Sequence, residues 1–314
     1  MEEILYRAAS YLLIIALGAS LKKAGVFRDS DFKTLAKVML YITLPCAIIY
    51  NFSSIEFDFS YLVLTAMGIG TGLIYILTAC IEGKILGRKK EIPFDIINFS
   101  GYNIGNFSMP FAQSFLGPMG VVAISLFDTG NAVICNGGSK AVAELVKGKG
   151  AGSRRNVGRE LLRSFQTIAR VLSRSVPFMT YLTMILLVMF RVPIPQIITS
   201  FSGTVAQANA FVAMLMIGVG FKLNIKGDGV FHVVRLLVSR YAVMAVFVFL
   251  AYWVLPFPLE IRQALVILVL SPIASANPAF TDALGEDFEL ASTVNSISMI
   301  ISIASITTAL LIML

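Results

Sequence analysis

The sequence predicts an all-α polytopic membrane protein, and three observations support this fold class. Hydrophobic residues make up 57% of the 314 positions and charged residues only 14%, whereas about 25% of a soluble globular protein is charged. Apolar runs of membrane-spanning length recur along the whole chain, so no separate soluble domain is visible. The basic residues gather in alternate short loops between these runs, which is typical of a chain that crosses a membrane repeatedly.

Ten segments have the length of a membrane span, because a helix needs roughly 20 mostly apolar residues to cross the hydrocarbon. Their approximate bounds are 4–22, 34–53, 59–83, 93–115, 120–146, 174–190, 202–221, 230–255, 261–284 and 289–313. The fourth and ninth are interrupted by amides, glycine and proline, so hydropathy alone would return eight spans. The first run lacks a preceding basic region, and we expect a retained span there rather than a cleaved signal peptide.

The loop charges predict how the spans are oriented. Loops after spans 1, 3, 5 and 7 contain basic residues in number, and loops after spans 2, 4, 6 and 8 contain almost none. Basic loops mark the cytoplasmic side of the cell membrane, whether plasma or inner membrane, so both termini are predicted to be extracytoplasmic. Because this placement accounts for the net charge of +7, nucleic acid is not an expected partner.

Residues 147–173 are predicted to form a basic cytoplasmic linker with an amphipathic helix. Apolar residues recur at helical spacing from Val157 to Leu172 with arginines between them, which is typical of a helix on a membrane surface. The linker divides the chain into a first five-helix repeat at 1–146 and a second, inverted repeat at 174–314. A lipid- or partner-sensing helix and a plain linker are the two interpretations of this segment.

An offset of 168 residues relates the two repeats. It brings the spans of one half onto those of the other in order, and it places Pro110 on Pro278. Each half has an odd number of spans, so the second half must enter the membrane upside down and equivalent loops should exchange their basic residues. Loop 22–33 has four basic residues and its equivalent, 190–201, has one. The sequence therefore predicts an inverted-topology repeat, the common architecture of secondary transporters.

The interrupted spans are the candidate substrate site, because Gly/Pro-broken segments at corresponding positions of two repeats mark the site of such transporters. We assign substrate binding to Asn103, Asn106 and Asn277, through their amides and the freed backbone groups. The helix breaks and their crossover are assigned to Gly105, Pro110 and Pro278. Hydrogen bonding to a neighbouring helix is the alternative role for each amide.

Two carboxylates are candidates for coupling transport to an ion. Asp128 lies near the middle of span 5, and Asp282 lies in span 9, nearer to a membrane face. An ionisable group at membrane depth indicates a functional role, here carrying a proton or helping to hold a sodium ion. A hydrogen bond or ion pair with a buried partner is the alternative for Asp128. Lys140 and Arg240 could meet an anionic substrate, although structural pairing is the commoner role of such cations.

The chain resembles the auxin efflux carrier family over essentially its whole length. The residues that carry the resemblance are Asn103-Ile-Gly-Asn106, Pro110, Phe115-Leu116-Gly117 and Gly120, with support from Leu44-Pro45 and Ala276-Asn277-Pro278. The family includes plant auxin carriers and bacterial carriers of malonate or other small organic acids. This chain lacks the long central hydrophilic loop of many plant members, so it looks like a bacterial or archaeal member.

The resemblance implies ten helices in two inverted repeats, with broken helices 4 and 9 crossing near their prolines. It implies a scaffold domain of helices 1, 2, 6 and 7 and a transport domain of helices 3–5 and 8–10 that moves in an elevator-like manner. Sodium–bile acid symporters look like relatives in fold. The implied function is secondary active transport of a small organic anion, such as a mono- or dicarboxylate. An anion channel or uniporter is the alternative, and a ligand-sensing receptor is a more distant one.

No enzyme signature is present in the sequence, which lacks a phosphate-binding glycine loop, a metal-ligand motif and a nucleophile elbow. We expect no cofactor beyond a coupling H⁺ or Na⁺. The cysteines Cys46, Cys80 and Cys135 lie inside apolar segments and predict no disulfide. The expected partners are the lipid bilayer and the anion, and a homodimer is left open.

Overall fold

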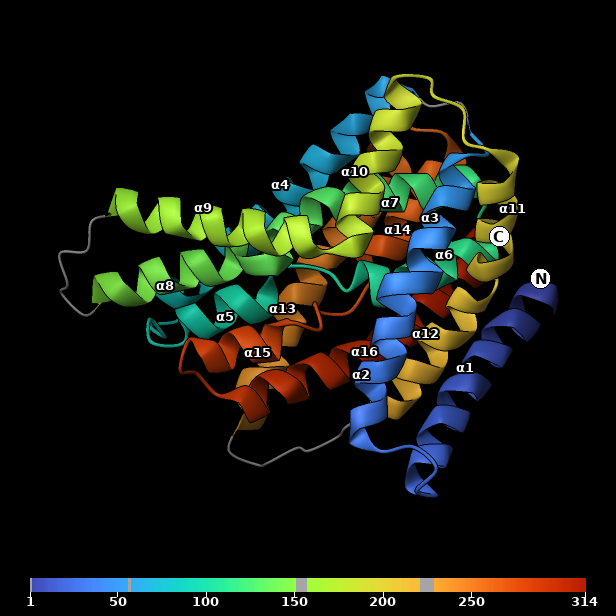
Figure 1. The fold of residues 1–314 in the computed structure, drawn as a ribbon. Coiled ribbons are helices and arrows are strands. Elements are labelled where there is room, and N and C mark those ends of the chain that lie inside the picture. Colours follow the sequence, from blue (N-terminus) through green and yellow to red (C-terminus); the bar gives the residue numbers. More distant parts are fainter. Residues whose placement is uncertain (1, 56–57, 151–156, 221–228) are drawn as a thin grey trace.

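The structure is a computed structural model that describes residues 2–55, 58–150, 157–220 and 229–314 (Figure 1). Within these ranges all regular secondary structure is helical, which confirms the predicted all-α class. Seven helices are long enough and apolar enough to cross a membrane, and the number is eight if the pair Phe165–Arg174 and Val176–Met189, bent by 82°, is taken as one span. These helices indicate a membrane protein. The two interrupted segments of the sequence are not among them.

The elements follow one another with short connections. The first half of the chain contains α1 (Glu2–Lys23), α2 (Asp29–Val38), η1 (Met39–Thr43), α3 (Leu44–Phe52), η2 (Phe59–Leu62), α4 (Val63–Ile85), α5 (Ile92–Phe99), η3 (Ile104–Ser108), α6 (Met109–Phe115), α7 (Pro118–Val133), η4 (Ile134–Gly138) and α8 (Ser139–Gly150). The second half contains α9 (Val157–Arg174), α10 (Val176–Met189), α11 (Gln196–Ala206), α12 (Ala208–Gly220), α13 (Val230–Phe249), η6 (Leu250–Val254), α14 (Leu259–Val269), α15 (Asn277–Ala283) and α16 (Phe288–Met313).

Helix starts follow the prolines of the sequence. A proline occupies the first or second position of α3, α5, α6, α7, α10 and α15. Proline is tolerated there because the N–H it lacks would have no partner within the helix. Pro278 lies where a helix begins again after an interruption, whereas Pro110 lies in the first turn of α6, which continues directly from η3.

The helices pack as two groups. In one, α12 lies against α1 and α2, and α3 lies against α10 and α11. In the other, α4 lies against α5 and α7, α14 against α7, and α15 against α16. Figure 1 shows α1, α2 and α12 together on one flank, with α5, α8 and α15 on the other. The buried cluster around Phe107 and Phe111 joins the groups, because it packs α6 against α1 and α12.

Two unwound segments lie where the groups meet. The chain is not helical between Phe99 at the end of α5 and Ile104 at the start of η3, nor between the end of α14 and Asn277. Gly101 turns the first segment with a φ of +80°, a conformation that glycine adopts without strain. The two segments touch, since the backbone N–H of Asn103 donates to the carbonyl oxygen of Pro272 at 2.9 Å.

The linker prediction falls partly outside the described residues, because positions 151–156 are not among them. From Val157 the linker is helical, as α9, and it lies beside α8 and the kink of η4 (Figure 1). Ile168 of α9 faces Gly137, whose φ of +132° forms that kink. Leu162 and Phe165 are exposed and leave an apolar stripe on the outer side of α9.

Candidate ligand site at the two helix breaks

A cavity of about 240 Å³ lies between the two unwound segments and the helices α7 and α10. One wall contains Asn103, Gly105 and Asn106 from the first break, together with Asp128 from α7. The second break adds residues 274–276, and the other helix group adds residues of η1, α3 and α10. The structure thus brings together four of the residues singled out in the sequence.

Asn106 lines the cavity and leaves one of its polar atoms without a partner in the described part of the chain. Its Nδ2 donates to Ser275 Oγ at 3.3 Å, which links the two breaks through side chains. Its Oδ1 is buried and has no hydrogen-bond partner among the described residues. A buried polar atom without a partner is costly unless a ligand or water satisfies it. The Asn103 side chain also lines the cavity, and its backbone N–H is already used by Pro272.

Asp128 is held by two neutral donors. Asn131 Nδ2 donates to its Oδ1 at 3.0 Å, and the Tyr181 hydroxyl donates to its Oδ2 at 3.3 Å. No lysine, arginine or histidine of the described residues forms an ion pair with it. Because Tyr181 belongs to α10 and Asp128 to α7, this hydrogen bond joins opposite walls of the cavity.

Amides on the following helix hold each break open. Asn131 Oδ1 accepts from the backbone N–H of Tyr102 at 3.0 Å, and its Nδ2 donates to the Tyr102 carbonyl at 2.9 Å. Asn295 of α16 donates to the carbonyl oxygens of Ile273 and Ala274 at 3.2 and 3.1 Å. Sequence reasoning missed Asn131 as a site residue. Polar residues in the span after each broken span were the signal that could have found it.

The remaining predicted site residues lie away from the cavity. Asn277 is completely buried, and its Nδ2 donates to the carbonyl oxygens of Ile97 and Ser100 at the end of α5. It therefore stabilises the crossover without lining the cavity. Asp282 is exposed on α15. Pro110 and Pro278 lie in the first turns of α6 and α15, outside the unwound residues.

Arg240 supports the same crossover from α13. Its Nη1 donates to the carbonyl oxygen of Phe99 and its Nη2 to that of Gly101 at 3.0 Å. Its guanidinium lies 4.7 Å from the ring centroid of Tyr75 and 5.3 Å from that of Tyr102. The side chain is completely buried, and the described residues place no carboxylate in an ion pair with it. Lys140, in contrast, pairs with Glu144 at 3.6 Å.

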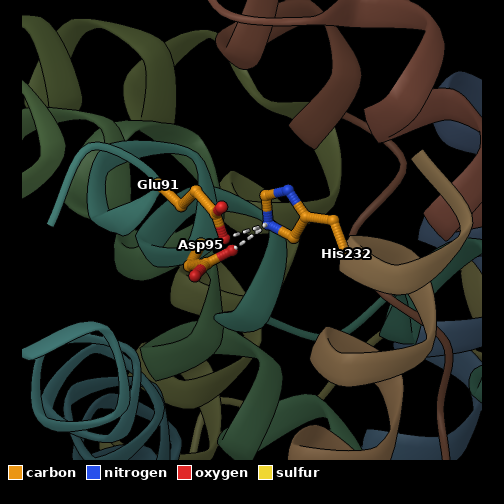
Figure 2. A group of neighbouring side chains, drawn as sticks. All are labelled: Glu91, Asp95 and His232. Carbon is orange, nitrogen blue, oxygen red and sulfur yellow. Dashed lines mark hydrogen bonds and ion pairs between the residues drawn. The ribbon is translucent and has the colours of Figure 1, made fainter. Parts of the chain in front are cut away.

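A separate polar cluster joins the start of α5 to the start of α13 (Figure 2). Ligand atoms of Glu91, Asp95 and His232 lie within 4.8 Å of one another, an arrangement that could hold a metal ion. His232 Nε2 lies 2.6 Å from Asp95 Oδ1. Arg235 already contacts both carboxylates, at 3.1 Å from Glu91 and 2.6 Å from Asp95. An ion-pair network explains the cluster, and a metal would have to compete with this guanidinium.

The sequence hid this cluster because its members come from two helices that are far apart along the chain. No family model matches the chain, and a comparison with curated proteins also finds no match.

Proposed function

We propose that the protein is a secondary active carrier of a small organic anion, such as a mono- or dicarboxylate. The observation that supports this most directly is the contact between two helix breaks beside a small cavity. The cavity volume of about 240 Å³ suits a compact solute, since pockets for drug-sized ligands span about 300–1,000 Å³. The Asn103 amide, the second Nδ2 hydrogen of Asn106 and the Ser275 hydroxyl are donors of the kind that bind a carboxylate.

Asp128 provides a means of coupling anion transport to the movement of a cation. An ionised Asp128 repels an anion in the same cavity, and a protonated Asp128 does not. Anion entry together with a proton is then favoured over entry alone, which is the condition for symport. Sodium beside Asp128 would neutralise the same charge, so both ions remain candidates from this residue alone.

The carrier is proposed to contain ten spans in two inverted five-helix repeats, as the resemblance to auxin efflux carriers implies. In this scheme α5–α6 and α14–α15 are the broken spans 4 and 9. The scaffold comprises α1, α2–α3, α10 and α11–α12. The transport domain comprises α4, α5–α6, α7–α8, α13, α14–α15 and α16. The two helix groups observed in the packing support this division. An elevator-like motion would then carry the breaks past α10 in the cell membrane, with both termini outside.

The test is uptake of labelled mono- and dicarboxylates into proteoliposomes. We expect saturable uptake and counterflow, and we expect Asn106→Ala to raise KM about tenfold, because a hydrogen bond to a charged ligand contributes about 1.5–3 kcal/mol. Asn51→Ala is the matched control, since the Asn51 amide bonds only Ala47 of its own helix. Normal uptake by Asn106→Ala would reject the site. Unsaturated, voltage-driven current without counterflow would identify an anion channel instead.

A further inference from the structure

Arg240 is a buried cation that the proposed transport cycle does not yet use. Burying a charge is costly unless other groups compensate it. Within the described residues the compensation comes from two carbonyl oxygens at the end of α5 and from the faces of two tyrosine rings. The C-terminal end of a helix carries partial negative charge, so α5 directs its negative end at this guanidinium.

The carbonyl oxygens at these breaks are the type of ligand that takes up a coupling cation. In transporters with broken helices, the unwound carbonyls and the C-terminal ends of half-helices coordinate Na⁺. In this protein, donors of the chain itself already form hydrogen bonds with these carbonyl oxygens. Arg240 binds the carbonyls of Phe99 and Gly101, and Asn131 binds that of Tyr102. In the second break, Pro272, Ile273 and Ala274 accept from the backbone of Asn103 and from Asn295.

Arg240 also lies directly behind the cavity. Tyr102 lines the cavity, and the guanidinium lies over the Tyr102 ring at 5.3 Å from its centroid. The buried guanidinium is thus in contact with a residue of the cavity wall. A charge in such a water-poor environment acts over a longer range than it does in water. It therefore attracts an anion into the cavity without touching it.

We propose that Arg240 is a built-in counter-cation of the crossover, which replaces a mobile coupling cation and gives the cavity its affinity for anions. The proposal rests on the carrier function proposed above. It has two consequences. Sodium has no binding site at the crossover, so transport is independent of sodium and the proton on Asp128 is the coupling ion. Removing the charge of Arg240 weakens anion binding and frees the carbonyls of Phe99 and Gly101 for a cation.

The experiment compares Arg240→Met and Arg240→Lys with Arg262→Met as the matched control. The Arg262 guanidinium also donates to a backbone carbonyl, that of Tyr252 at 2.8 Å, and lies 5.8 Å from the Tyr252 ring, away from the breaks. Thermal unfolding of each purified protein is measured in NaCl and in choline chloride. We expect no sodium-specific stabilisation of the wild type or of Arg262→Met, and a sodium-specific stabilisation of Arg240→Met. This comparison requires no transport.

Uptake in proteoliposomes supplies the second measurement. We expect wild-type uptake to be equal in sodium and choline buffers, and KM for the anion to rise about tenfold or more in Arg240→Met, since each tenfold change reflects about 1.4 kcal/mol of lost attraction. Arg240→Lys keeps the charge and should show a smaller rise. It also tests the proposal if the methionine variant does not fold.

Sodium-specific stabilisation of the wild type, sodium-stimulated uptake, or an unchanged KM in Arg240→Met would overturn the proposal. The sodium comparison can give the expected result although the wild type carries no anion. The proposed carrier function is then wrong, but the conclusion that Arg240 occupies the place of a cation at the crossover is retained.

Discussion

Amide side chains replace backbone hydrogen bonds at the two helix breaks. Asn131 pairs with both backbone groups of Tyr102, and Asn277 caps the end of α5. Unwound backbone at membrane depth is tolerated only where such partners satisfy it. Asn106 differs from these amides, because it lines the cavity and its Nδ2 donates to the Ser275 side chain instead of to a backbone carbonyl. That difference separates a candidate ligand contact from the residues that hold the backbone.

The sequence predicted some of these residues for a physical reason. Asn103, Asn106 and Asp128 stand out because polar groups at membrane depth are rare, and all three line one cavity. Tyr181 could not be found in this way, since a tyrosine in an apolar helix has no unusual sequence signature. Its hydroxyl reaches Asp128 only through the packing of α10 against α7. The carboxylate could be predicted, but its partner could not.

Asp128→Asn tests the proposed proton coupling at the scale of one residue. The amide has nearly the shape of the carboxyl group and carries no charge at any pH. We therefore expect a proton gradient to stop driving uptake, while anion binding, measured by thermal shift, persists. Asp282→Asn is the control, because Asp282 is an exposed carboxylate outside the cavity. A wild-type dependence of uptake on pH in Asp128→Asn would reject the coupling role.

At the scale of elements, the interruptions were predictable but their positions were not. The unwound residues precede Pro110 and Pro278 by several positions. Proline marks where the helix resumes only at the second break, because after the first break the helix resumes at Ile104 in η3. Glycine and the amide partners on other helices determine where the chain unwinds. The partners lie on α7 and α16, and their contact with the breaks depends on tertiary packing.

The contact between α4 and α7 leads to a stability prediction. A Cβ atom on Gly68 would collide with the carbonyl oxygen of Phe127, whereas one on Gly70 would meet no atom within 4 Å. Gly68→Ala should destabilise the protein by about 1–3 kcal/mol, because the helices must separate to admit the methyl group. Gly70→Ala, in the same helix, should be neutral or stabilising by up to about 1 kcal/mol. Thermal unfolding in detergent checks both, and equal unfolding temperatures for the two variants would contradict this close packing.

The end of α10 gives a prediction of opposite sign. Arg191 has a φ of +53°, and the N–H groups of Arg191 and Val192 donate to the carbonyls of Val188 and Leu187. This is a Schellman ending, in which glycine is the usual residue at the left-handed position. Arg191→Gly should raise the unfolding free energy by about 0.5–1 kcal/mol. Arg191→Ala keeps the strain and serves as the control. A lower unfolding temperature for Arg191→Gly than for Arg191→Ala would contradict the predicted preference for glycine at this position.

At the scale of the whole molecule, polar contacts cross between the two helix groups around the cavity. Asn209 of α12 accepts from Thr43 at 2.7 Å and donates to Gln113 of α6 at 2.8 Å. Arg7 of α1 donates to the carbonyl oxygen of Ser114 at 2.6 Å. In the proposed carrier, an elevator-like motion of α6 past α1 and α12 would have to break the hydrogen bonds that join these helices. The apolar contacts around them can slide, because they have no fixed geometry.

The proposed ten-span topology depends on whether α5–η3–α6 crosses the membrane or returns to the side from which it entered. Lys89 precedes this segment, Arg191 follows α10, and both side chains are exposed. If the broken span crosses, three spans separate these positions, and they lie on opposite sides. We expect a membrane-impermeant maleimide to label Arg191→Cys from outside intact cells and Lys89→Cys only after permeabilisation, with the native cysteines replaced by serine.

A cysteine in place of Leu314 should label from outside, because both termini are predicted to be there. Labelling of Lys89→Cys and Arg191→Cys from the same side would make the broken segment re-entrant. An inverted five-helix repeat could then not be built, because each half would contain an even number of crossings.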